Sequence, residues 1–161
     1  MIAFRVYGEA QPQGSARAFT PKGWSRPIIT TANPSLKTWR QLVATAANDT
    51  LNALPANQRA LLLDGVRLTV AFYLPRPKSL AKRTTAHTKN PDLDKLVRSI
   101  CDSLTAICFT DDKQVCELVA AKHYAPVGGS PYVDVRVEAT AGVARVSVPA
   151  ARLPLFGAVA P

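Results

Sequence analysis

The chain is poor in acidic residues, in cysteine and in long apolar runs, and each shortage excludes a class of protein. Its 161 residues include 11 Asp and Glu against 20 Lys and Arg, which gives a net charge of +9 at pH 7. The 3 cysteines form no C-x-x-C pair, which argues against zinc and dithiol redox sites, and we expect them to be reduced and mostly buried. No apolar run reaches the ~18–20 residues that a bilayer requires. Residues 1–7 alternate like a strand and do not resemble a secretory signal, so we expect a cytoplasmic protein.

The composition indicates a folded protein with a polyanionic partner. Hydrophobic residues make up 47% and charged residues 19%, which is typical of a globular domain, and the length fits one domain. The excess of Lys and Arg favours nucleic acid, because basic side chains gain affinity by releasing counterions from phosphates. An anionic membrane surface is less favoured, since no basic amphipathic helix stands out.

Apolar periodicity predicts a single α/β domain with a mixed sheet. The expected strands and helices, in the order β-α-β-α-β-β, span 2–7, 35–54, 66–74, 92–106, 114–124 and 132–138. Ser35 is the expected cap of the first helix. Segments 8–34 and 75–90 read as long loops, the first one loose or hairpin-like. The domain is expected to cover 1–140, and the acid-free segment 141–161 is expected to be a flexible tail.

A cluster of acidic residues occupies one short stretch of this basic chain. Six of the 11 acids fall within the 26 positions from 92 to 117, namely Asp92, Asp94, Asp102, Asp111, Asp112 and Glu117. Gathered like charges repel unless something compensates them. Carboxylates suit Mg²⁺ or Mn²⁺, and a Mg²⁺ site usually combines one or two carboxylates with waters and substrate phosphates. We therefore predict a divalent cation bound by Asp92, Asp94, Asp111 and Asp112; the alternative is that these residues are ordinary caps and turns.

The placement of the acids suits hydrolysis of a phosphodiester. Asp92 and Asp94 flank the first helical turn, where the helix dipole favours their ionised forms. Positions two apart do not share a helix face, so Asp92 must lie at or before the cap for the two carboxylates to converge. The Asp111–Asp112 pair arrives from a separate turn, and metal-assisted phosphodiester chemistry needs groups that meet in this way. Asp102 follows Arg98 by four residues, which predicts an ordinary ion pair between them.

Basic residues in the two long loops are the candidate DNA contacts. They are Arg17, Lys22 and Arg26 in the first loop, and Arg76, Lys78, Lys82, Arg83 and Lys89 in the second, with Lys95 on the helix that follows. Trp24 could stack on an unpaired base or anchor the packing of its loop.

Three acidic motifs resemble the signature of RusA-type Holliday junction resolvases. They are P-D-L-D-K-L at 91–96, D-S-L at 102–104 and D-D-K-Q-V at 111–115. The start, with G-E-A-Q-P at 8–12 and S-A-R at 15–17, resembles that of phage-type members. The resemblance covers 2–138 and implies a Mg²⁺-dependent endonuclease of bacteria and prophages that acts in DNA recombination and repair. It also implies a homodimer that nicks two opposed strands of a four-way junction symmetrically. The family's essential carboxylates match Asp92, Asp94 and Asp112.

Two positions depart from the family's pattern. Lys95 stands where Asn is usual, and Arg98 stands where the family has a catalytically important Lys. Arginine can clamp a phosphate through two hydrogen bonds, but it is a poor proton donor. We therefore expect Arg98 to bind phosphate. A junction-binding protein with impaired catalysis remains open, as does an RNA-binding protein whose acidic cluster is structural.

The tail carries a second motif. R-L-P-L-F at 152–156 resembles the Q-L-x-L-F peptide by which bacterial DNA enzymes dock on the replicative sliding clamp, with Arg152 in place of Gln. Leu153, Leu155 and Phe156 would fill an apolar groove, as short linear motifs do. Incidental apolar residues in a tail rich in Ala and Pro are the alternative.

Overall fold

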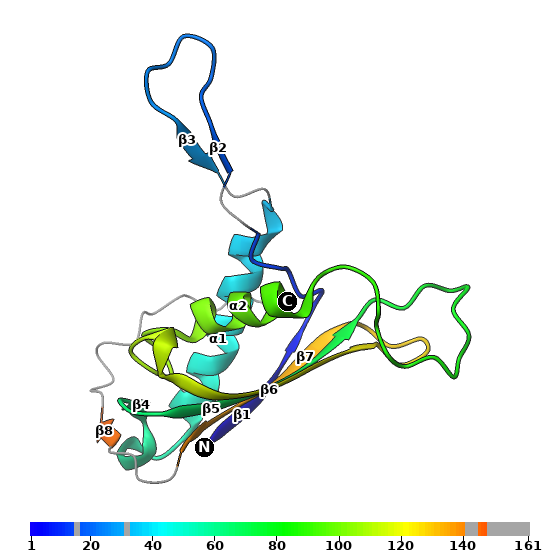
Figure 1. Cartoon of the computed structure of the whole chain (residues 1–161). Coiled ribbons are helices and arrows are strands. Elements are labelled where there is room, and N and C mark those ends of the chain that lie inside the picture. Colours follow the sequence, from blue (N-terminus) through cyan, green and yellow to red (C-terminus); the bar gives the residue numbers. More distant parts are fainter. Residues whose placement is uncertain (15–16, 31–32, 141–144, 148–161) are drawn as a thin grey trace.

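The computed structural model describes residues 1–14, 17–30, 33–140 and 145–147, and its centre is a four-stranded mixed sheet (Figure 1). The strand order is β1 (Ile2–Tyr7), β7 (Tyr132–Ala139), β5 (Val66–Leu74) and β6 (Val115–Tyr124). β5 and β6 run parallel, and the other neighbours run antiparallel. The predicted mixed sheet is confirmed, and each of its strands begins and ends within one residue of the predicted bounds.

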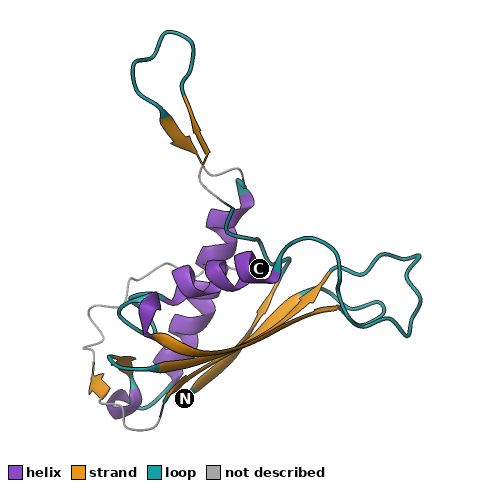
Figure 2. Cartoon of the chain, viewed as in Figure 1, coloured by secondary structure: helices purple, strands orange, loops and turns teal. Residues whose placement is uncertain are grey.

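Two helices cover one face of this sheet (Figure 2). α1 spans Ser35–Ala53 and packs on β1 and on α2, which spans Leu93–Leu104. α2 connects the parallel strands β5 and β6, which cannot be joined by a tight turn. The prediction that Ser35 caps α1 was wrong by one residue: Pro34 occupies the cap position, and the Asn33 side chain accepts the Ser35 N–H at 3.1 Å.

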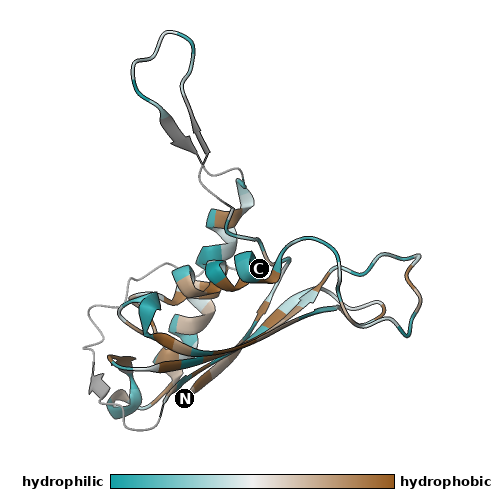
Figure 3. Ribbon diagram, viewed as in Figure 1, coloured by the Kyte–Doolittle hydropathy of each residue, from teal (hydrophilic) through white to brown (hydrophobic). Residues whose placement is uncertain are grey.

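The core lies between the sheet and the helices, as the alternation along β5 predicts. Figure 3 shows hydrophobic stretches along the strands and on both helices. Val66, Leu68 and Phe72 of β5 are fully buried, and Trp39 of α1 and Ile100 of α2 pack in the same cluster. Each such side chain contributes about 1.5–3 kcal/mol relative to exposure, so this packing decides which side of α2 faces solvent.

The remaining elements are short. β2 (Arg17–Phe19) and β3 (Ile28–Thr30) form a hairpin that stands away from the body in Figure 1, within the first predicted loop. Two 3-10 turns, η1 and η2, span Ala56–Gln58 and Asp112–Gln114. β4 (Ala60–Leu62) pairs with β8 (Arg145–Ser147), so the segment expected to be only a tail contributes a strand. The motif at 152–156 lies outside the described residues. No described helix is long and apolar enough to cross a membrane.

Candidate active site

The start of α2 presents two exposed carboxylates, as the sequence predicts. Asp92 occupies the cap position in an extended conformation, and Asp94 lies in the first turn. The Asp92 side chain makes no capping hydrogen bond and instead accepts one from Lys95 Nζ at 2.7 Å. This bond, the charge of Lys95 and the charge of Lys122 lower the pKa of Asp92. Asp92 is therefore ionised at neutral pH, the form that binds a cation.

Lys122 of β6 is a member of this site that the sequence did not reveal. Its Nζ donates 2.7 Å hydrogen bonds to the carbonyl oxygens of Lys89 and Pro91, which precede Asp92. The side chain lies on the helix side of the sheet, at the level of buried Phe72 in β5. A lysine at an inward-facing strand position was the available signal, because such a residue needs polar partners.

The second acidic pair lies in a turn built by Gln114. Its Oε1 accepts the Asp111 N–H at 2.9 Å, while its Nε2 donates to the carbonyls of Leu62 and Asp64. Asp111 caps this turn and also pairs with Lys113 at 3.0 Å, and a hydrogen bond from the Lys113 backbone lowers the pKa of Asp111. Asp111 is thus committed to local structure, whereas Asp112 is exposed. The D-D-K-Q sequence carries the signature of this capping box.

The two acidic pairs lie toward different ends of α2. Because β5 and β6 are parallel, α2 runs back across the sheet, and the Asp112 turn follows its far end. Burial and, to a smaller extent, the negative charges of Asp112 and Asp102 together raise the pKa of Cys101 to about 11, which places Asp112 near Cys101. Asp94, Arg98 and Cys101 share a helix stripe, with roughly 10 Å of axis between the first and the last. Exposed Arg98 therefore lies between the two acidic ends.

The carboxylates at the start of α2 suit a cation that takes its other ligands from water and from the substrate. In the part of the chain that the structure describes, no three His, Cys, Asp or Glu side chains gather as a metal-binding group. A Mg²⁺ ion needs only one or two carboxylates when waters and substrate phosphates supply the rest, so Asp92 and Asp94 fit it. The assignment of one cation to all four aspartates, with Asp111 and Asp112, stays a prediction.

The predicted partner of Asp102 was wrong. Arg40 of α1 forms an ion pair with the Asp102 carboxylate, with 3.6 Å between Nη1 and Oδ2. Its Nη2 also donates a hydrogen bond of 3.1 Å to the Asp102 backbone carbonyl. α1 packs against α2 at this point, and only the tertiary structure brings Arg40 there. Arg98 consequently has no ion-pair partner among the described residues and is available to a phosphate.

The basic residues of the two loops differ in their surroundings: most are exposed, whereas Arg76 holds the backbone of its own loop. Arg76 donates to the backbone carbonyls of Ala81, Thr84 and Ala125, so we assign it to the scaffold of its loop. The other basic residues of that loop are exposed, namely Lys78, Lys82, Arg83 and Lys89. In the turn between β2 and β3, Lys22 and Arg26 are exposed, and Trp24 is 61% exposed. Arg17 lies in β2. Trp24 is therefore not buried against other described residues, and it does not anchor the packing of its loop.

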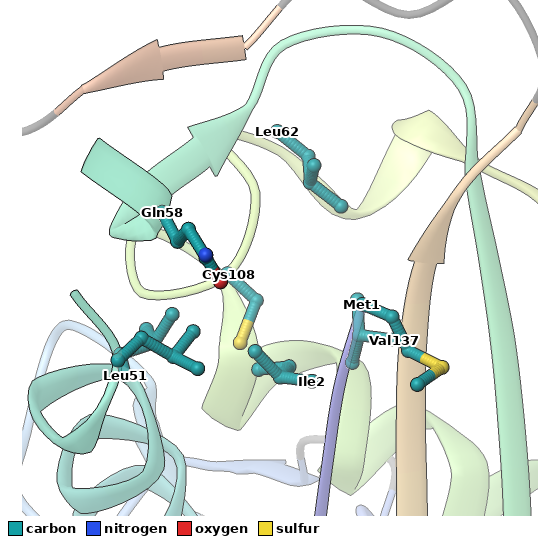
Figure 4. Close-up of a pocket in the computed structure, with 8 residues that line it drawn as sticks. Met1, Ile2, Leu51, Gln58, Leu62, Cys108 and Val137 are labelled. Atoms are coloured by element: carbon teal, nitrogen blue, oxygen red, sulfur yellow. The ribbon is translucent and has the colours of Figure 1, made fainter. Parts of the chain in front are cut away.

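An apolar pocket at another end of the sheet is separate from this site (Figure 4). Met1, Ile2, Leu51, Leu54, Gln58, Leu62, Cys108 and Val137 line it. None of these side chains is charged, and burial raises the pKa of Cys108 to about 12, so its thiol stays protonated. The cysteines are free as expected, with Cys108 buried and Cys101 partly buried, but the expectation of burial was wrong for exposed Cys116.

A comparison with protein families shows which family the chain belongs to. The family model described as Endodeoxyribonuclease RusA matches residues 9–138. The chain belongs to the RusA family. A similar protein, the uncharacterized YqaN of Bacillus subtilis (strain 168), is 29% identical over 147 residues, which cover 84% of this chain and 94% of that protein. Members of the RusA family are endodeoxyribonucleases, and the match includes both acidic pairs and both basic loops.

Proposed function

We propose that this RusA-family protein is a Mg²⁺-dependent, structure-selective endonuclease that resolves four-way DNA junctions by paired symmetric nicks. It would act as a homodimer in DNA recombination and repair, with Mn²⁺ as a possible replacement for Mg²⁺. One observation carries this proposal: two exposed carboxylates at the start of α2 lie on the same helix as Arg98, which has no ion-pair partner among the described residues, within a basic chain that matches RusA.

Each residue of the site has a distinct role in this proposal. Asp92 and Asp94 would hold the cation together with water and phosphate oxygens, and exposed Asp112, toward the other end of α2, would be a further acidic residue of the family's essential set. A bound Mg²⁺ activates water and neutralises charge on the phosphoryl and leaving oxygens. Arg98 would clamp a non-bridging phosphate oxygen, and its charge would offset the negative charge of the transition state. Because a guanidinium is a poor proton donor, solvent would protonate the leaving oxygen.

The exposed loops would hold the DNA. Lys22 and Arg26 on the β2–β3 turn, and the four exposed basic residues of the second loop, would contact phosphates and make affinity strongly dependent on salt. Trp24 lies between the two cations of the turn, and its exposure favours stacking on an unpaired base at the branch point.

Cleavage of a synthetic four-way junction, beside a linear duplex of the same sequence, tests this function. We expect paired nicks in the junction with Mg²⁺ and none with EDTA. Asp94→Asn should abolish the nicks and preserve junction binding, because it removes a ligand without changing the basic loops. Tight binding by the wild type without nicks would instead indicate a junction-binding protein with impaired catalysis.

A further inference from the structure

Four aromatic side chains form a row across the four-stranded sheet. Tyr7 of β1 lies opposite Tyr132 of β7 in the register of the sheet. Tyr73 of β5 lies opposite both Tyr132 and His123 of β6. Every strand of the sheet thus contributes one ring at the same level, and we call these four residues the aromatic row. Neighbouring strands are about 4.8 Å apart, so the row is about 14 Å long.

The aromatic row lies on the face of the sheet that the helices leave open. Phe72 of β5 and Val6 of β1 are buried in the core, and each directly precedes a member of the row. Successive side chains of a strand point to opposite faces, so Tyr73 and Tyr7 point away from the helices. Both helices lie on the other side of the sheet in Figure 2.

Contacts within the sheet hold the middle of the row. Tyr73 and Tyr132 stack, with 4.3 Å between ring centroids and 20° between ring planes. The Arg5 guanidinium lies over the Tyr132 ring at 4.0 Å from the centroid, and because Tyr73 covers one face of that ring, Arg5 covers the other. Asp134 fixes this guanidinium by accepting hydrogen bonds of 2.7 and 2.9 Å. The inner rings are therefore ordered by the protein itself.

This packing does not account for Tyr7 at the end of the row. Its ring is tilted by 55° to the Tyr132 ring, the two centroids are 6.2 Å apart, and the residue is 66% exposed. A tyrosine that is neither buried nor stacked gains little from the fold. Tyr7 instead presents an aromatic ring to solvent beside a stack that is already ordered, which is the arrangement that a flat ligand ring can extend.

The row borders the second basic loop. β5 ends at Leu74, one residue after Tyr73, and the loop begins there. Ala86 of the same loop forms a β-bridge with His123, so the loop also adjoins the β6 end of the row. The exposed cations that this loop brings to the end of the sheet are Lys78, Lys82 and Arg83.

The acidic residues of the open face do not oppose a polyanion. On the four strands, three acids point to this face, and each is paired with an arginine, namely Asp134 with Arg5, Glu117 with Arg67, and Glu138 with Arg136. The rings of the row carry no negative charge at neutral pH. Free positive charge therefore borders the row, and the acids of the four strands on this face are neutralised.

We propose that the aromatic row is a binding site for single-stranded DNA, with the exposed cations of the second loop holding the sugar-phosphate backbone. Unpaired bases expose flat faces that stack on aromatic rings, whereas a duplex keeps those faces within its own stack. A basic border combined with aromatic rings is the usual pattern of sites that bind single strands. Tyr7 stacks on a base in this proposal, and a row of about 14 Å accommodates a few nucleotides.

This site is distinct from the acidic site but close to it along the sheet. Lys122, which supports the chain before Asp92 through the Pro91 carbonyl, directly precedes His123 of the row. The two sites thus lie at the same end of the sheet on opposite faces. The proposal goes beyond the proposed nuclease function, because binding an unpaired strand requires neither a cation nor cleavage.

Binding of a short, fluorescein-labelled oligothymidylate, followed by fluorescence anisotropy in EDTA, tests the site. Every protein in the series carries Trp24→Ala, so that stacking on the β2–β3 turn does not contribute. We expect this parent to bind the oligonucleotide and Tyr7→Ala to weaken binding about 5- to 100-fold, the loss expected for one stacked base. Tyr7→Phe keeps the ring and should bind like the parent. Leu42→Ala, at an exposed leucine of α1, is the matched control and should also bind like the parent.

Salt dependence separates stacking from phosphate binding. Tyr7→Ala removes no charge, so the slope of log Kd against log salt concentration should equal that of the parent. Lys82→Ala combined with Arg83→Ala should flatten this slope. A changed slope in Tyr7→Ala would show that the substitution disturbs the basic loop, and it would refute stacking by Tyr7.

Photocrosslinking tests the contact directly. An oligothymidylate that carries iodouracil should crosslink to Tyr7 on irradiation, as mapped by mass spectrometry. The proposal is overturned if the parent does not bind the oligonucleotide, if Tyr7→Ala binds it as tightly as the parent, or if crosslinks form only at residues outside the row and its basic loop. None of these measurements uses Mg²⁺, so a protein that cleaves no junction would refute the nuclease function and leave this test unaffected.

Discussion

Replacing Lys122 with Met should reduce catalysis far more than stability. Lys122 Nζ donates to the carbonyls of Lys89 and Pro91, at 2.7 Å each. Hydrogen bonds from a charged donor contribute about 1.5–3 kcal/mol each when buried. Lys89 is exposed, and Lys122 and Pro91 are partly buried, so water replaces much of this energy. We therefore expect the free energy of unfolding to fall by only about 1–2 kcal/mol.

The effect on rate follows from the place of those carbonyls in the chain. They precede Asp92, and their release would let its carboxylate move relative to Asp94. A misplacement of about 1 Å costs on the order of 10²-fold in rate. We expect kcat on the junction to fall about 100-fold, with KM changed less than about threefold, because the ammonium binds protein carbonyls rather than DNA.

Single-turnover cleavage, Mg²⁺ titration and thermal unfolding measure these effects together. Lys122→Arg keeps donors at this position and should recover part of the rate. Lys37→Met, at an exposed lysine of α1, should leave rate and stability near those of the wild type. A Lys122→Met protein whose unfolding free energy falls as expected, but which still cleaves within threefold of the wild-type rate, would refute the role of Lys122 in positioning Asp92.

Four further predictions concern separate parts of the chain. Arg98→Lys should raise the single-turnover rate at least about tenfold, because a lysine can add proton transfer to phosphate binding, and general acid catalysis contributes about 10²–10⁴-fold. Trp24→Ala should weaken junction binding about 5- to 100-fold in a titration, since stacking on a base contributes about 1–3 kcal/mol. Gln114→Ala should lower the unfolding free energy by about 2 kcal/mol in urea, because this amide bonds to several backbone groups that hold the Asp111–Asp112 turn. Leu155→Ala with Phe156→Ala should abolish capture by the bacterial sliding clamp in a pull-down and leave junction cleavage unchanged.

Each of these has a result that would count against it. A slower Arg98→Lys enzyme would mean that two-point phosphate clamping matters more than proton transfer. Equal loss of linear-duplex binding by Trp24→Ala would argue against a role at the branch point. A Gln114→Ala protein as stable as the wild type would show that water substitutes for the amide. If the variant is captured by the clamp as well as the wild type, the tail motif does not bind the clamp.

Local patterns were sufficient for the core and for the first half of the site. β5 was predictable because alternate residues from Val66 to Leu74 must be apolar to face the helices. Asp92 and Asp94 were placed correctly because a helix start depends on neighbouring residues and on the helix dipole. The β2–β3 hairpin was less predictable, since its strands are only 3 residues long and provide little periodicity.

Contacts between distant segments could be known only from the folded chain. The composition, the apolar periodicity and the acidic motifs by themselves determined the α/β class, the nuclease family and the start of α2. The tertiary structure decided that Arg40 pairs with Asp102, that Lys122 supports the chain before Asp92, and that β6 lies at the edge of the sheet. Periodicity reports which side of an element is buried but not which element packs there, because that depends on chain topology and on packing between residues far apart in sequence.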